Sequence, residues 1–368
     1  MKKSILACLI LGLIASSSAF AMPSGILPYG VGAKYAAMGG AGASLVDDIA
    51  AAYYNPAGMY RSGGMDLKIG AGTASDGSDQ LMKVFGNMTN PAKFLSDNFS
   101  SSLDINGNAN AMLGLSIANI GLSVMPAGNL RLLKAANTLD GTILGGGYSD
   151  SALTFGYGLK IPYLAKAGVG INLKYIHNAA VSAAVAASGA TTTMTNTVTQ
   201  YSGMGFDVGL QGTLDVIPTA PISVAVVYKD LASNLNGTAQ VSAGTFNTLT
   251  GAEITPMTTV SDGPIAGTSV PSTLVIGASG QIPLIGLKVA ADIDTIGGNT
   301  PYSVTHIGLE YPLAMGLVNL RIGKISGSNV DMFTYGAGIL KDTINIAMIS
   351  DNKNSKNNQM IADVHIGF

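Results

Sequence analysis

The chain has 368 residues, of which 47% are apolar and only 11% are charged, and its formal net charge is -2. A typical globular protein carries about 25% charged residues, so the charged side chains of an ordinary water-exposed surface are largely missing. No basic block accompanies the small net charge, and we therefore exclude nucleic acid as a partner.

Residues 1–21 have the parts of a secretory signal peptide in order. A basic start and an apolar run over 5–15 lead to a small-x-small cleavage site that ends at Ala21. We therefore expect export and cleavage before Met22. No later segment offers the roughly eighteen strongly apolar residues of a transmembrane helix, which argues against a helical membrane protein.

The only cysteine, Cys8, lies within this signal peptide. It ends a short stretch that resembles a lipoprotein cleavage box, but the apolar run before it is too short to serve as a signal core. We expect the mature chain to lack thiols, disulfides and thiolate metal sites. The three histidines are scattered along the chain, so neither a metal nor a cofactor is expected.

The segment over 22–63 is not strand-like, and it contains the most specific motif of the chain. A run of small residues with Met38-Gly39-Gly40 leads through the acidic pair Asp47-Asp48 to a Tyr-x-Asn-Pro-Ala-Gly motif. Proline fixes φ in a tight turn, and an asparagine side chain can bond the local backbone. The simplest interpretation is a turn that stabilises the fold without binding a ligand. The motif residues are Asn55, Pro56, Ala57 and Gly58.

From Met65 onward, short runs alternate apolar residues with glycine or polar residues, which is the period of a β-strand. A soluble sandwich would carry Lys and Glu on its polar face, whereas nearly half of these positions are Gly, Ala, Ser or Thr, as on the inside of a closed barrel. We therefore predict an all-β, transmembrane antiparallel barrel of about 14 strands over 64–368. The runs lie near 65–73, 110–118, 120–126, 151–161, 167–178, 203–213, 221–230, 272–282, 285–294, 304–312, 316–324, 332–340, 343–350 and 359–368.

The connections between these runs alternate long and short along the chain. Bacterial outer-membrane barrels have long extracellular loops and short periplasmic turns, so both chain ends are expected on the periplasmic side. We expect the stretches 178–201 and 231–271 to be mobile loops, with a hairpin inside the second as the alternative.

Residues 79–99 gather apolar side chains within a stretch otherwise rich in Asn, Asp and Ser, with partly helical spacing. On an extracellular loop, such a cluster would form a patch for ligand capture. A loop that buries these side chains on itself fits the pattern equally well. The residues of the predicted patch are Leu81, Met82, Phe85, Phe94 and Phe99.

The C-terminal run ends on an aromatic residue. Val364, Ile366 and Phe368 alternate with polar residues and glycine, which resembles the β-signal read by the outer-membrane assembly machinery. The alternative is an ordinary edge strand that ends on Phe by chance.

The N-terminal motif resembles the corresponding segment of the long-chain fatty-acid transporter (FadL) family and of its PorV-type relatives. Outside this segment the chain matches them only in architecture and length. The resemblance implies a hatch over 22–63 that folds into the lumen of the barrel, and passive uptake of hydrophobic small molecules, such as long-chain fatty acids or aromatic hydrocarbons, across the cell outer membrane. PorV-type relatives instead serve as carriers or scaffolds for secreted proteins, and the motif does not separate the two roles.

A hatch also makes physical sense, because the lumen of a barrel of this size is too wide for wall side chains to fill. Charged residues on the inner face suggest ion pairs between wall and hatch, although a solvated polar lumen is an equally good interpretation. His306 and His365 are expected to hydrogen-bond within the lumen. No motif marks a Ser–His arrangement, so no enzyme is expected. The inward charges are Asp66, Lys68, Lys160, Lys174, Asp207, Lys288, Asp292, Asp294, Glu310, Arg321 and Asp363.

Overall fold

The computed structural model of the chain describes residues 29–62, 64–74, 100–136, 140–161, 164–214, 221–247, 250, 252–298, 300–355 and 358–367. Within these ranges the chain forms fifteen strands in one antiparallel sheet. They are β1 (Met65–Ala74), β2 (Leu103–Ile117), β3 (Ile120–Lys134), β4 (Gly141–Ile161), β5 (Leu164–Ser188), β6 (Thr191–Leu214), β7 (Ile222–Asn247), β8 (Glu253–Thr268), β9 (Thr273–Ile282), β10 (Leu287–Ile296), β11 (Tyr302–Leu313), β12 (Val318–Gly327), β13 (Asp331–Ile339), β14 (Ile344–Asp351) and β15 (Gln359–Gly367).

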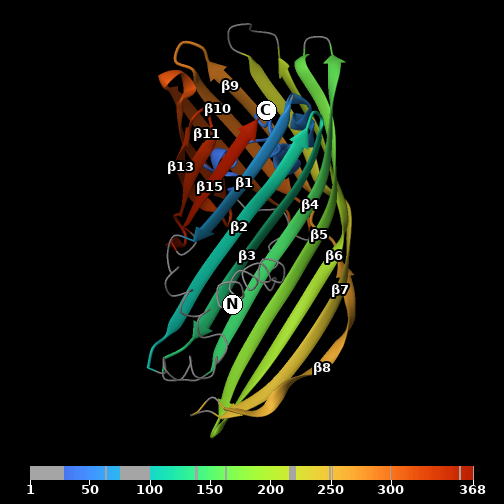
Figure 1. Cartoon of the computed structure of the whole chain (residues 1–368), viewed down its shortest axis with the longest axis vertical. Helices are drawn as coiled ribbons and strands as arrows, with labels where there is room; N and C mark the ends of the chain where they lie inside the picture. The colour runs from blue at the N-terminus through green and yellow to red at the C-terminus, as the bar shows by residue number, and fades with distance from the viewer. Residues whose placement is uncertain are drawn as a thin grey trace.

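The sheet closes on itself to form a barrel (Figure 1). β1 pairs with both β2 and β15, and neighbouring strands follow in chain order around each side. The first part of β7, over Ile222–Lys229, pairs with β9, while β7 also pairs with β6 along its length. The predicted all-β antiparallel closed barrel is confirmed.

Within the described residues the sheet has one strand more than the 14 runs that we counted, because the hairpin given as the alternative within 231–271 is present. Its strands are the distal part of β7 and β8, which pair between Leu235 and Phe246 of β7. Residues 178–188 and 191–201 belong to β5 and β6, and 231–247 and 253–268 to β7 and β8, so these stretches are strands rather than mobile loops. These stretches are rich in Thr, Val and Ala and nearly free of charge, and β-branched residues fit an extended sheet.

The wall has a long side and a short side. Strands β4 to β7 have 21 to 26 residues, whereas β9 to β15 have 8 to 12. A strand crosses a bilayer with roughly 9–11 residues. The distal parts of β5 to β8 therefore project far beyond the short side, toward the bottom of Figure 1.

Side chains alternate between the two faces of the wall. Outward positions carry exposed large apolar residues such as Leu122, Phe155 and Ile171. Inward positions are buried and polar, small or charged, as at Asp207 and Arg321. The short helices α2 (Ala33–Ala36), α3 (Ala51–Tyr54) and η1 (Pro56–Arg61) precede the barrel, and η2 (Ala314–Gly316) joins β11 to β12. Among the described residues, no helix is long and apolar enough to cross a membrane.

Candidate functional site: the N-terminal segment and its contacts with the wall

The N-terminal segment, residues 29–62, lies inside the ring of strands. Tyr35, Asn55 and Met59 have no exposed surface, and the hydrogen bonds of the segment reach strands on opposite sides of the barrel. In Figure 1 it is the dark blue chain enclosed by the strands. The segment therefore occupies the space that a wall of this size would otherwise leave open.

The predicted motif forms a tightly bonded turn at the start of η1. The Asn55 amide nitrogen donates to the carbonyl oxygens of Ala43 (2.9 Å) and of Leu210 in β6 (3.1 Å). Its side-chain oxygen accepts a hydrogen bond from the Ala57 N–H at 3.0 Å, which caps the helix behind Pro56. Asn55 thus ties two parts of the segment to the wall, in agreement with a stabilising turn.

Glycines in the wall make room for this turn. A Cβ atom on Gly170 would overlap the backbone of Pro56, one on Gly209 would overlap the Asn55 side chain, and one on Gly156 would lie 2.5 Å from the Tyr60 nitrogen. The missing side chains of β4, β5 and β6 therefore form the groove that receives η1.

A second groove receives the Met-Gly-Gly element. Gly308 of β11 and Gly323 of β12 lie against the backbone of Met38 and Gly39, and a Cβ on either would clash. Gly39 and Gly40 have φ angles of 68° and 79°, in the left-handed region that favours glycine after a helix. The Gly39 N–H donates to Thr334 Oγ1 of β13 at 2.9 Å.

Wall side chains satisfy other buried backbone groups of the segment. Asp292 Oδ2 accepts from the N–H groups of both Gly42 and Ala43 at 2.8 Å. Asn172 donates to the Ala52 carbonyl at 2.8 Å and Gln211 to that of Ser44 at 2.9 Å. Because buried N–H and C=O groups without partners are costly, these bonds select one position of the segment in the ring.

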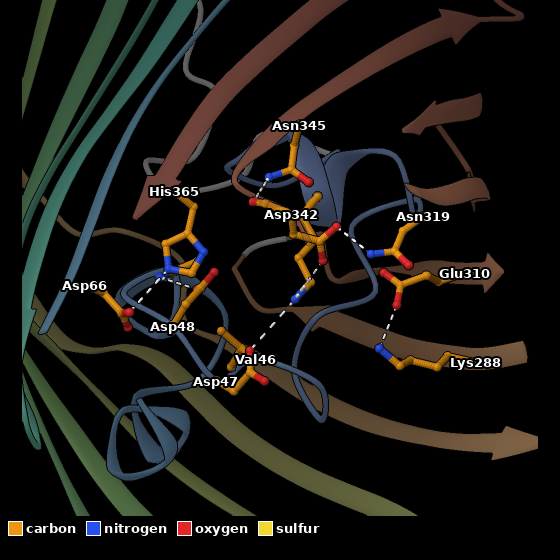
Figure 2. A network of polar contacts seen from close by, with 12 residues as sticks. Val46, Asp47, Asp48, Asp66, Lys288, Glu310, Asn319, Asp342, Asn345 and His365 are labelled. Atoms are coloured by element: carbon orange, nitrogen blue, oxygen red, sulfur yellow. Dashed lines mark hydrogen bonds and ion pairs between the residues drawn. The ribbon is translucent and has the colours of Figure 1, made fainter. Parts of the chain in front are cut away.

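Ion pairs also join the segment to the wall (Figure 2). Lys68 Nζ of β1 lies 2.5 Å from Asp48 Oδ2, and both side chains are almost completely buried. Burial raises the pKa of the Asp48 carboxyl, but the positive charges of Lys68, Lys34 and His365 outweigh it and lower this pKa to about 2. Asp48 therefore remains charged at neutral pH.

A second network connects Lys34 of the segment to the ends of β11 and β12. Lys34 Nζ lies 3.7 Å from Asp342, whose other carboxyl oxygen lies 2.5 Å from the Arg321 guanidinium. Arg321 Nε also donates to Glu310 at 2.8 Å, and Lys288 pairs with the second oxygen of Glu310 at 2.6 Å. Burial opposes the charge on Asp342, yet Arg321 and Lys34 hold its pKa below the usual value.

A third ionic group lies wholly within the wall. Lys174 of β5 pairs with Asp207 of β6 at 2.8 Å and with Asp230 of β7. Asp230 and Ala232 have φ angles of 58° and 47°, and the register between β6 and β7 shifts close by. Lys174 thus holds the bulge at which β7 leaves β9 and turns into the projecting sheet.

Most of the predicted inward charges are buried as expected, while Lys160 is exposed. The two predicted histidine contacts are also present. His306 Nδ1 lies 2.7 Å from the Gly39 carbonyl oxygen, so this nitrogen carries the proton, and His365 Nε2 lies 3.3 Å from Asp66 Oδ1. Lys34 and Asp342 were not identified from the sequence, because nothing local marks either as part of a network.

A small cavity lies between the segment and the wall. It is lined by Tyr53, Lys229, Asp294 and His306 among others, and has about 20 Å³ of room, enough for roughly one water molecule. The Lys229 ammonium lies 4.6 Å from the centroid of the Tyr53 ring, a cation–π distance.

Other predicted residues lie partly outside the described part of the chain. Leu81, Met82, Phe85, Phe94, Phe99 and Phe368 all fall outside it. Val364 and Ile366 lie on the outer face of β15, 42% and 39% exposed. Within the described ranges, no group of three or more His, Cys, Asp or Glu residues could hold a metal ion.

Fold and site together define a closed antiparallel β-barrel whose interior holds its own N-terminal segment. No protein-family model matches the chain, and no curated protein matches it. Solved structures do match over nearly the whole length. The Ralstonia pickettii toluene transporter TbuX is 15% identical, with 92% of this chain and 98% of that chain covered and a TM-score of 0.58.

Two further solved structures match the chain to a similar extent. The Pseudomonas putida toluene transporter TodX is 13% identical over 91% of this chain and 96% of its own, with a TM-score of 0.57. The CymD monoaromatic hydrocarbon channel is 13% identical over 93% and 99%, also with a TM-score of 0.57. The structural resemblance predicted from the N-terminal motif is therefore confirmed for the fold.

Proposed function

We propose that the protein is an outer-membrane channel for the passive uptake of hydrophobic small molecules. The observation that carries this proposal is the fold, which is shared over more than nine-tenths of the chain with channels named for toluene and monoaromatic hydrocarbons. Fold alone does not fix function, so the proposal also needs support from the wall and from the segment inside it.

The outer surface of the wall supports a membrane location. Apolar residues alternate along the outward positions of adjacent strands, for example Leu115, Leu122 and Leu153, which are 44%, 59% and 37% exposed. In water, exposing so many large apolar side chains would favour aggregation. In a bilayer, the same side chains contact lipid.

The N-terminal segment supports a hatch role. It packs closely against the glycine grooves and forms ion pairs with the wall, so we expect the barrel to exclude sugars and salts. A hydrophobic molecule would need either a rearrangement of this hatch or a route beside it. We favour aromatic hydrocarbons over long-chain fatty acids as the cargo, because the matching channels are named for aromatic compounds.

A second candidate function is a PorV-like carrier or scaffold for secreted proteins. Two observations favour it: the tight packing of the segment, and the sheet formed by the distal parts of β5 to β8, which offers a large surface outside the membrane. Among the described strands β8 pairs only with β7, so its other edge is available to receive a strand of another protein.

Uptake measurements test the first candidate. Labelled toluene and labelled oleate are offered to cells that lack their own transporters, with and without the protein at a measured membrane abundance. Faster entry of toluene, without a matching gain for oleate, supports the aromatic channel. Faster oleate entry would identify fatty acids as cargo, whereas no gain for either probe, together with a stably bound secreted protein, would support the scaffold.

A further inference from the structure

Three neighbouring turns expose large apolar residues at the end of the barrel where β1 begins and β15 ends, the upper end in Figure 1. Leu284 between β9 and β10 is 97% exposed, and Met315 between β11 and β12 is 101% exposed. Leu340, between β13 and β14, is 60% exposed. β9 to β14 pair in chain order, so these turns follow one another around the rim.

Two of these turns have backbone φ angles that favour glycine or asparagine over the residues found there. Ala314 and Met315 have φ angles of 48° and 56°, and Leu340 and Lys341 have 54° and 57°. Tight hairpin turns with positive φ favour Gly, Asn and Asp, because bulkier residues are strained there. The chain thus carries apolar side chains at positions where glycine or asparagine would cost less free energy.

The strands beneath these turns differ in length. β14 has 8 residues, which at about 3.3 Å per residue and a tilt of about 40° gives a height of about 20 Å, less than the roughly 25 Å apolar band of an outer-membrane barrel. β9 to β12 have 10 to 12 residues and by the same conversion give about 25–30 Å, enough to fill the band. Leu340 therefore lies above a strand that is too short for the band, whereas Leu284 and Met315 extend the apolar surface to its edge.

The turns continue the outward apolar surface without a break. Ile282, Leu313 and Ile339, the last outward residues before them, are 44%, 38% and 39% exposed. The connections at the opposite ends of these strands, 297–301, 328–330 and 352–358, consist mostly of Gly, Asn, Ser, Thr and Lys. The apolar extension is therefore confined to one end.

We propose that the turns at 283–286, 314–317 and 340–341 enter the lipid interface and extend the lipid-facing apolar surface of the barrel beyond the ends of their strands. Leu284, Met315 and Leu340 contact the acyl chains nearest the headgroups, and the exposed Lys341 reaches the phosphates. With both chain ends on the periplasmic side, as expected from the loop lengths, these turns enter the periplasmic leaflet. This inference rests on the proposed membrane location but not on any transported substrate.

Single cysteines test the depth of these turns. In a Cys8→Ser background, Leu284→Cys, Met315→Cys and Leu340→Cys are each labelled with an environment-sensitive fluorophore and reconstituted into phosphatidylethanolamine–phosphatidylglycerol vesicles. Matched controls are Asn119→Cys, in the turn between β2 and β3, and Asn329→Cys, at the opposite end. We expect at least twofold stronger quenching by nitroxide-labelled lipid than for the controls, and weaker quenching by aqueous iodide.

Iodide quenching equal to that of Asn119→Cys would overturn the inference. Labels that are open to iodide in vesicles but protected in native outer membranes would also overturn it, in favour of a protein partner. Ile293→Cys is at an outward position in the middle of β10. It distinguishes a failure of this inference from a failure of the proposed membrane location. If Ile293→Cys also contacts water, the protein is not a membrane barrel.

Discussion

Lys68 on β1 and Asp48 in the N-terminal segment form a buried ion pair, with 2.5 Å between Nζ and Oδ2. Among the described residues it is one of few direct charge contacts between the segment and the wall, and Lys68 also lies 5.5 Å from the Tyr35 ring centroid. Both side chains are almost completely shielded from bulk solvent, so each depends on the other for its charge to be compensated.

Removing one member of this pair should loosen the segment. Lys68→Met leaves the Asp48 carboxylate buried and unpaired, which costs about 3–5 kcal/mol. The loss should appear as a lower midpoint in urea unfolding followed by proteolysis of the segment. The double variant with Asp48→Leu should recover much of it. Lys324→Ala is the control and should change little, because the side chains of Lys324 and of its partner Asp331 are 41% and 39% exposed. Equal effects of Lys68→Met and Lys324→Ala would contradict the role of the buried pair.

Low pH should break the same ion pair between Lys68 and Asp48. The pKa of Asp48 falls from 3.8 to about 2 in the folded barrel, so its stabilising contribution is complete above about pH 4. That contribution is lost as the pH falls from about 4 through about 2, because the unfolded state then binds the proton more readily. Protease sensitivity of the segment should rise over this range in the wild type. In Asp48→Asn it should already be high at neutral pH and should change less with acid.

The glycine groove in β4 and β5 should be intolerant of side chains. Gly170→Ala places a Cβ against the backbone of Pro56, where neither side can yield easily, and should displace η1. The expected result is leakage of small sugars in liposome swelling. Gly263→Ala in β8 is a matched control, because no atom lies within 4 Å of the added Cβ. If the Gly170→Ala barrel still excludes small sugars, the segment does not seal the lumen by this contact.

Epitope tags test the orientation of the barrel. Tags at Gly189 and Thr250, at the tips of the projecting sheet, and near Asn354 should be reachable from outside intact cells. Tags near Ala165, at the start of β5, and near Lys341, between β13 and β14, lie at the opposite end and should not be reachable. Asn236, in the stretch 231–271 that we expected to be a loop, lies within β7 and is unsuitable for an insertion. Reversed accessibility would overturn the periplasmic assignment of the chain ends.

The strands on the short side were predictable because an apolar outer face and a packed polar inner face force a strict alternation. For example, the runs expected at 65–73 and 359–368 correspond to the observed strands Met65–Ala74 and Gln359–Gly367. β8 lacks this constraint. Almost every residue of β8 is exposed on both faces, and Pro256, Asp262 and Gly263 break any pattern that would mark a strand. Periodicity therefore fails where the two faces of a strand do not differ in their surroundings.

The site was predictable only in part for a similar reason. The motif around Asn55 could be found because its turn chemistry is local. The partners of Lys34, and the fit of Gly170 to Pro56, depend on how distant strands close around the segment. Register brings Gly156 opposite Gly170 across β4 and β5, and such paired inward glycines are the one sequence signal that could have indicated the groove.

Removal of the hatch tests the central claim most directly. The intact protein and a variant that lacks residues 22–63 are compared at equal membrane abundance, by liposome swelling with small sugars and by uptake of labelled toluene. Burial of apolar area contributes roughly 25 cal/mol per Å² only where an apolar surface is available, and a bare polar pore offers little. We predict that the intact barrel excludes sugars and passes toluene, and that the deletion reverses both results. An intact barrel that passes sugars freely, or a deletion that leaves both rates unchanged, would contradict the account of a hatched channel for hydrophobic molecules.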